Sequence, residues 1–121
     1  MNEIRLDDET LPVYLRRNEC MRLLDLAISE AKRRGELMVE KEAEYYKAKA
    51  EESFLLLEAG HANTFIQSVI KGRPDVNEAM TAHHAAEVLY KNANEAINAY
   101  KLKLRCLEAD LEREWEQAGR M

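Results

Sequence analysis

The stretch NEAINAYKLKLRCLEADLEREW, residues 94–115, repeats apolar side chains three and four positions apart. The same spacing starts upstream, and its members are Val76, Ala79, His83, Ala86, Tyr90, Ala93, Ile97, Tyr100, Leu104, Leu107 and Leu111. Alternating steps of three and four place these side chains along one line of an α-helix, as in a coiled coil. The pattern therefore predicts a helix over about residues 76–117 with a single apolar seam, which only His83 interrupts with a polar group.

The composition agrees with long helices. The chain has 121 residues, of which 34% are charged, and only four Gly and two Pro. Such a composition favours helix over strand. A chain of this size supports one domain with a modest core, so oligomerisation is a natural way to bury more apolar surface. The net charge of -5 argues against a generally basic nucleic-acid-binding protein but leaves room for a local basic patch.

Two further apolar stripes lie upstream. The first is Met21, Leu24, Ile28 and Ala31, and the second is Val39, Ala43, Tyr46, Ala50, Phe54 and Leu57. They predict helix over about residues 12–58, interrupted only by Gly35. Gly35 either ends one helix, which gives a three-helix bundle, or lies inside a continuous helix at a cost of ~1 kcal/mol. The stripes keep the same phase through Gly35, which favours the continuous helix.

The segment between the long helices predicts a connector over residues 59–75 that contains a short helix. Gly60 is typical of a helix stop, and Pro74 and Asp75 are typical of a helix start. The predicted fold is therefore all-α: a flexible N-terminus over residues 1–10, then one domain over residues 11–121. Its long antiparallel helices form a coiled-coil-like hairpin that we expect to dimerise, because several leucines lie outside the stripes. They are Leu23, Leu55, Leu56, Leu89 and Leu102.

The carboxyl end of the last helix is acidic, which the helix dipole disfavours. Its charges are Glu108, Asp110, Glu112, Glu114 and Glu116. A hairpin folded about Gln67 would place Arg16, Arg17 and Arg22 beside residues 112–118. The same pairing would bring two basic clusters together into one belt: Lys32, Arg33 and Arg34 with Lys101, Lys103 and Arg105. The belt is either solvated surface or a contact for a nucleic-acid backbone.

His83, His84 and Glu87 are the candidates for a metal site, since His83 and Glu87 share one helical face. The chain contains three histidines in all and no paired Glu-x-x-His motif, so no metal and no cofactor is predicted. The alternative role of His83 is a polar seam residue that fixes helix register. No nucleophile motif or phosphate-binding loop is recognisable, which indicates a non-enzymatic protein.

Candidate contact residues for a protein partner are Phe65, Ile66 and Trp115. Phe65 and Ile66 lie in the connector, where the sequence offers no long element to bury them. Trp115 lies one position past the seam, where a large aromatic side chain either covers the end of the hairpin or anchors a partner.

The opening residues MNEIRLDDET lack the basic start and apolar run of a signal peptide, and no apolar run reaches the ~20 residues of a membrane span. Two distant cysteines, Cys20 and Cys106, are then most simply free thiols in a reducing compartment. These features predict a cytoplasmic protein with no membrane contact.

The run EAINAYKLKLRCLEADLEREW, residues 95–115, resembles the carboxyl end of a family of small helical proteins from tailed bacteriophages of Gram-positive bacteria, often encoded among replication and recombination genes. The resemblance covers residues 35–115 and includes Glu44-Tyr45 with Lys47 and Ala48, the segment 60–64, Lys71-Gly72 before Val76, and Ala86-Glu87 with Tyr90. It implies a helical fold and a role in the host cell cytoplasm, and it assigns no functional residues.

Two functions follow as hypotheses. The first is an interaction protein that binds a host or phage protein as an inhibitor or adaptor. The second is an accessory factor for phage DNA replication or recombination, which binds single-stranded nucleic acid through the basic belt.

Overall fold

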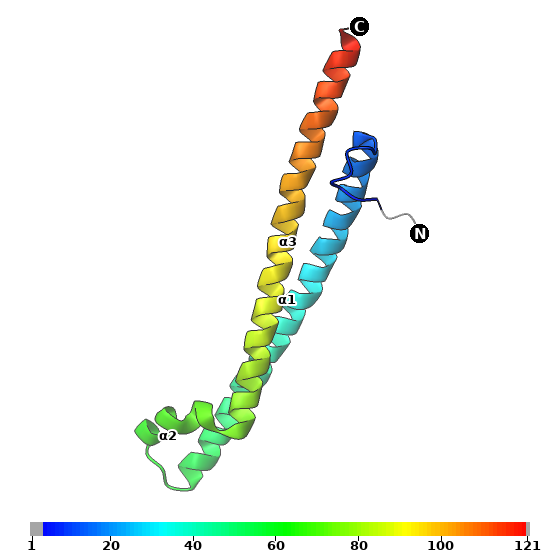
Figure 1. Ribbon diagram of the computed structural model, residues 1–121. Coiled ribbons are helices and arrows are strands. Elements are labelled where there is room, and N and C mark those ends of the chain that lie inside the picture. Colours follow the sequence, from blue (N-terminus) through cyan, green and yellow to red (C-terminus); the bar gives the residue numbers. More distant parts are fainter. Residues whose placement is uncertain (1–3, 121) are drawn as a thin grey trace. The chain divides into compact units, whose positions relative to one another are not determined.

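The computed structural model describes residues 4–120, which form helices and turns and contain no strand. The helices are α1 (Val13–Glu58), α2 (Asn63–Val69), the 3-10 turn η1 (Ile70–Gly72) and α3 (Pro74–Gly119). Helices α1 and α3 lie side by side and α2 lies in the connector between them (Figure 1). The predicted all-α helical hairpin is confirmed. The dimer remains a prediction.

The ends of the long helices follow local rules. Gly60 has a φ of 93°, and after α1 the amide of His61 donates to the carbonyl of Leu56 while that of Gly60 donates to Leu57. This pair of bonds is the Schellman motif, which needs a residue such as glycine in the left-handed region. Pro74 opens α3, where a missing amide costs nothing.

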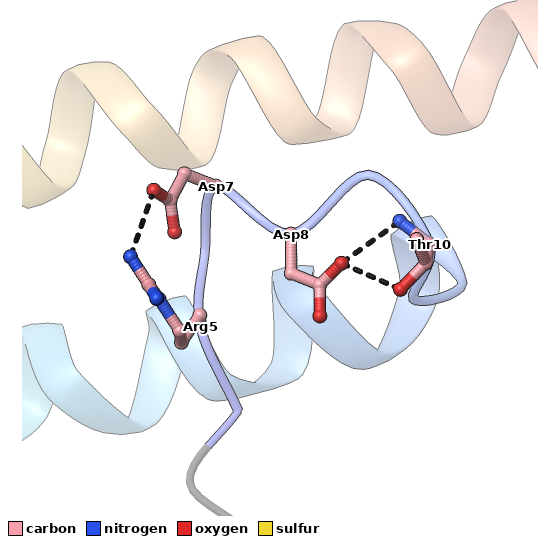
Figure 2. A network of polar contacts seen from close by, with 4 residues as sticks. All are labelled: Arg5, Asp7, Asp8 and Thr10. Carbon is pink, nitrogen blue, oxygen red and sulfur yellow. Dashed lines mark hydrogen bonds and ion pairs between the residues drawn. The ribbon is translucent and has the colours of Figure 1, made fainter.

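A turn precedes α1. Asp8 accepts hydrogen bonds from the amide of Thr10 at 3.0 Å and from its hydroxyl at 2.5 Å, and Arg5 pairs with Asp7 at 3.4 Å (Figure 2). The bonds from Thr10 lower the pKa of the Asp8 carboxyl. Leu6 packs against the apolar cluster beneath this turn. The predicted flexible N-terminus spans this turn, and its first three residues lie outside the described part of the chain.

The chain forms two compact units, and α1 and α3 each contribute a segment to both. The first unit combines Met1–Ala31 with Asn92–Met121, and the second is Lys32–Lys91. In the first unit the Cys20 thiol donates to the Tyr100 carbonyl at 3.5 Å, and Arg17 lies 3.7 Å from Glu108. Within this unit, the partners on α3 fall from Glu108 to Tyr100 as the residues on α1 rise from Arg17 to Cys20, so these two segments run antiparallel.

Gly35 lies inside α1, so the three-helix alternative does not occur. Its position in the second unit also explains why glycine suits the site. A Cβ atom at Gly35 would lie 2.9 Å from the Tyr90 ring, closer than side-chain atoms approach one another. The missing side chain therefore makes room for Tyr90.

The predicted fold about Gln67 is wrong in its register. In the second unit Arg34 donates to the Leu89 carbonyl at 3.0 Å, and Arg73 donates to Glu52 at 2.6 Å. Helix α3 therefore begins opposite Glu52, about one and a half turns before α1 ends. The last turns of α1 instead cover the connector, as described next.

The connector has its own core. Leu56 of α1 forms a buried cluster with Ile66 of α2, Ile70 of η1 and Val76 of α3. The apolar side of α2 is buried against the end of α1 and the start of α3. Helix α1 therefore extends beyond the residue that lies opposite the start of α3. The register of the two helices differs for this reason from that of a hairpin folded about Gln67.

The seam predicted for α3 is correct, since all eleven of its positions are buried or half-buried. The stripe predicted for the carboxyl half of α1 is wrong. Val39, Ala43, Tyr46, Ala50, Phe54 and Leu57 are all exposed, and we call them the outer seam of α1. The face toward the core carries Tyr45, Ala48 and Leu56 instead. One residue turns a helix by about 100°, so these two columns face in different directions.

Leu56→Ala tests the packing of the connector. We expect it to lower the free energy of unfolding by about 2–3 kcal/mol, because the truncated side chain leaves a cavity in the cluster. The matched control is Leu55→Ala, which removes a side chain that is 57% exposed rather than 8%; its effect should be below about 0.5 kcal/mol. Urea unfolding followed by circular dichroism measures both, and equal effects would contradict the assignment of Leu56 to the core.

Gly35→Ala tests the contact with Tyr90. Alanine gains about 0.5–1 kcal/mol of helix stability over glycine, but here its Cβ displaces the ring. In a Tyr90→Ala background we expect that full gain, and in the wild type a result at least about 0.5 kcal/mol less favourable. Denaturation of the four proteins measures the coupling. The same gain in both backgrounds would mean that Tyr90 does not pack on Gly35.

Candidate interaction surface

The outer seam of α1 is a regular row of apolar side chains that the second unit leaves uncovered. Val39, Tyr46 and Phe54 are 60%, 57% and 60% exposed. Exposed apolar side chains are common singly, but a row with the three-and-four spacing of a helix seam is the pattern that helices use to pack against other helices. The sequence revealed this row and assigned it to the wrong partner.

Charged residues on the solvent side flank the outer seam. Glu40, Glu44, Glu51 and Glu58 are exposed acidic residues of this segment, and Lys47 is the exposed base among them. Lys41 pairs with Glu44 at 3.1 Å, which offsets part of this charge. The surface beside the seam is predominantly acidic.

The prediction that Ile66 is an exposed contact residue of the connector is wrong. It is 4% exposed, because the end of α1 covers it, so it is a core residue. Phe65, the preceding residue of α2, is 46% exposed, and its ring stacks on that of His61 at 4.7 Å between centroids. Phe65 therefore remains a surface residue with one aromatic neighbour.

Trp115 lies in the first unit and is 73% exposed. It lines a shallow hollow of about 380 Å³ with Arg17, Glu108, Leu111 and Glu112. The guanidinium of Arg17 reaches Glu108, not the residues 112–118 that the sequence predicted. Arg22 pairs with Glu19 on its own helix. The acidic end of α3 thus receives a basic partner from α1 at Glu108, before the range 112–118 that the sequence predicted.

The two predicted basic clusters have different neighbours. Arg34, in the second unit, contacts Leu89. In the first unit, burial raises the pKa of the Cys20 thiol, and the charge of Lys103 offsets part of this increase. The pairing that would have joined Lys32, Arg33 and Arg34 with Lys101, Lys103 and Arg105 followed from the wrong register. Nucleic-acid binding by these residues remains a prediction without support from their contacts.

The candidate metal ligands do come together in the second unit. One ligand atom each from His83, His84 and Glu87 lies within 4.8 Å of the other two. Glu42 was not predicted from the sequence. Its carboxylate oxygen lies 4.0 Å from the Nε2 of His83, across the two helices. Only the correct register places Glu42 there, so spacing along the chain gave no signal for it.

No protein-family model, curated protein or solved structure matches this chain. Within residues 4–120, none of the helices combines the length and apolar character that crossing a membrane requires. The function is therefore inferred from the protein's own surface.

The pairing of Arg17 with Glu108 is testable by a double-mutant cycle. We expect a coupling energy of about 0.2–1 kcal/mol for Arg17→Ala with Glu108→Ala, as for other exposed ion pairs. The control cycle of Arg17→Ala with Glu112→Ala should give less. Thermal or urea unfolding at low salt measures both, and a larger coupling to Glu112 would restore the register predicted from the sequence.

Proposed function

We propose that this protein acts by binding another protein and not by catalysis, and that the outer seam of α1 is the contact surface. The observation that supports this proposal is that all six residues of the outer seam are exposed. A single helix presenting six apolar residues at heptad spacing gains free energy when a second helix covers them, because each buried apolar side chain leaves water.

The spacing of the row defines the partner. Steps of three and four residues match the side-chain rows of an α-helix, so the partner presents an amphipathic helix, as in other helix-in-groove complexes. The apolar face of the partner helix packs against Tyr46, Phe54 and the other side chains of the outer seam.

The acidic residues beside the outer seam indicate which charge the partner helix carries. Glu40, Glu44, Glu51 and Glu58 favour a helix with lysine or arginine beside its apolar face. A second copy of this chain would bring acidic residues beside acidic residues. The seam is therefore better suited to a basic partner helix than to a dimer of the protein.

The resemblance to phage proteins supports a host or phage protein as the partner, in the host cell cytoplasm. In this proposal the protein is an inhibitor or an adaptor. Phe65 in the second unit and Trp115 in the first are secondary contact candidates, each on its own unit.

The proposal is tested with a fluorescein-labelled helical peptide that carries Leu at its core heptad positions and Lys beside them. We expect the wild type to bind it and Tyr46→Asp with Phe54→Asp to weaken binding at least about 10-fold, because a charge then lies in the apolar contact. The control is Val88→Asp, an equally exposed apolar position on α3, which should bind like the wild type. A peptide with Glu in place of Lys should bind more weakly.

Sedimentation velocity distinguishes the partner helix from self-association. In place of the dimer expected from the sequence, the proposal expects the protein alone to sediment as a monomer at micromolar concentration. A dimer that Tyr46→Asp and Phe54→Asp dissociate would mean that a second copy covers the seam. Peptide binding that these changes leave intact would refute the seam as the contact surface.

A further inference from the structure

A polar cluster lies where α3 passes α1 in the second unit. The imidazole Nε2 of His83 lies 3.1 Å from one carboxylate oxygen of Glu87, and the Nδ1 of His84 lies 3.7 Å from the other. The same Nε2 of His83 faces Glu42 of α1 at 4.0 Å. Two imidazoles and one carboxylate of α3 therefore lie together, and a second carboxylate, from Glu42 of α1, lies beside His83.

The spacing of these atoms suits a metal ion. Zinc bonds to nitrogen and oxygen at about 2.0–2.2 Å in a tetrahedral site, so neighbouring ligand atoms lie about 3.4 Å apart. The separations of 3.1 and 3.7 Å bracket that distance, and one ligand atom from each of His83, His84 and Glu87 lies within 4.8 Å of the other two.

The position of His83 is fixed by packing. Its side chain is 13% exposed, and its ring stacks with that of Tyr45 at 6.2 Å between centroids and 23° between planes. Stacking against α1 holds Nε2 toward the two carboxylates. The other donors are more exposed, so an ion could enter from solvent.

We propose that His83, His84, Glu87 and Glu42 bind one divalent transition-metal ion of the zinc class, which links α1 to α3. Imidazole nitrogen favours zinc, cobalt, nickel or copper, whereas calcium and magnesium prefer oxygen donors alone. Without an ion the same groups form His–Glu pairs separated by 3.1, 3.7 and 4.0 Å. Metal binding is independent of the proposed contact at the outer seam of α1.

The test uses tag-free full-length protein, because a histidine tag binds the same metals. Isothermal titration calorimetry with zinc chloride should give one ion per chain, and cobalt(II) should give the visible absorption of a tetrahedral site. His84→Ala and Glu87→Gln change exposed side chains, so the helices persist, and each should weaken binding at least about 10-fold. His61→Ala removes the third histidine, in the connector, and should bind like the wild type.

Glu42→Gln tests the link between the helices. The wild type should melt at a higher temperature with zinc, since an ion bound only by the folded state stabilises it. Glu42→Gln should lose at least about 10-fold in zinc affinity and most of that increase. Zinc binding that Glu42→Gln leaves unchanged would overturn the bridging role. No zinc or cobalt binding, or binding that His84→Ala and Glu87→Gln do not weaken, would overturn the site.

Discussion

The burial of Ile66 and Ile70 beneath the last turns of α1 determines how the helices of the second unit meet. These two side chains leave water together with Leu56 of α1 and Val76 of α3. Helix α3 consequently starts opposite Glu52, where Arg73 pairs with that residue. The contact of Gly35 with Tyr90 and the approach of Glu42 to His83 both belong to this register.

The same packing leaves the outer seam of α1 without a partner in the described chain. Carboxyl-terminal α1 carries two neighbouring apolar columns, and a helix can turn only one of them toward α3. Leu56 holds the inner column against the connector, so Tyr46 and Phe54 face solvent. The proposed binding surface and the proposed metal site therefore both follow from the way α1 packs against the connector and α3 in the second unit. They lie on different faces of α1.

The sequence predicted the helices and the seam of α3, because each seam position there is apolar or His83. It could not select the phase of α1. Tyr45 and Tyr46 are adjacent, as are Leu55, Leu56 and Leu57, so either column satisfies the spacing. The selection came from tertiary contacts, namely the room beside Gly35 and the cover that α2 needs. Glu42 was missed for the same reason.

Cysteine alkylation under native conditions tests the orientation of α1 most directly. Single cysteines at positions 46, 54 and 56 are compared with the native thiols, of which Cys20 is buried and Cys106 is exposed. The account predicts that Tyr46→Cys and Phe54→Cys react as fast as Cys106 in the monomer, and that Leu56→Cys reacts as slowly as Cys20. Protection at 46 and 54 with fast reaction at 56 would contradict it.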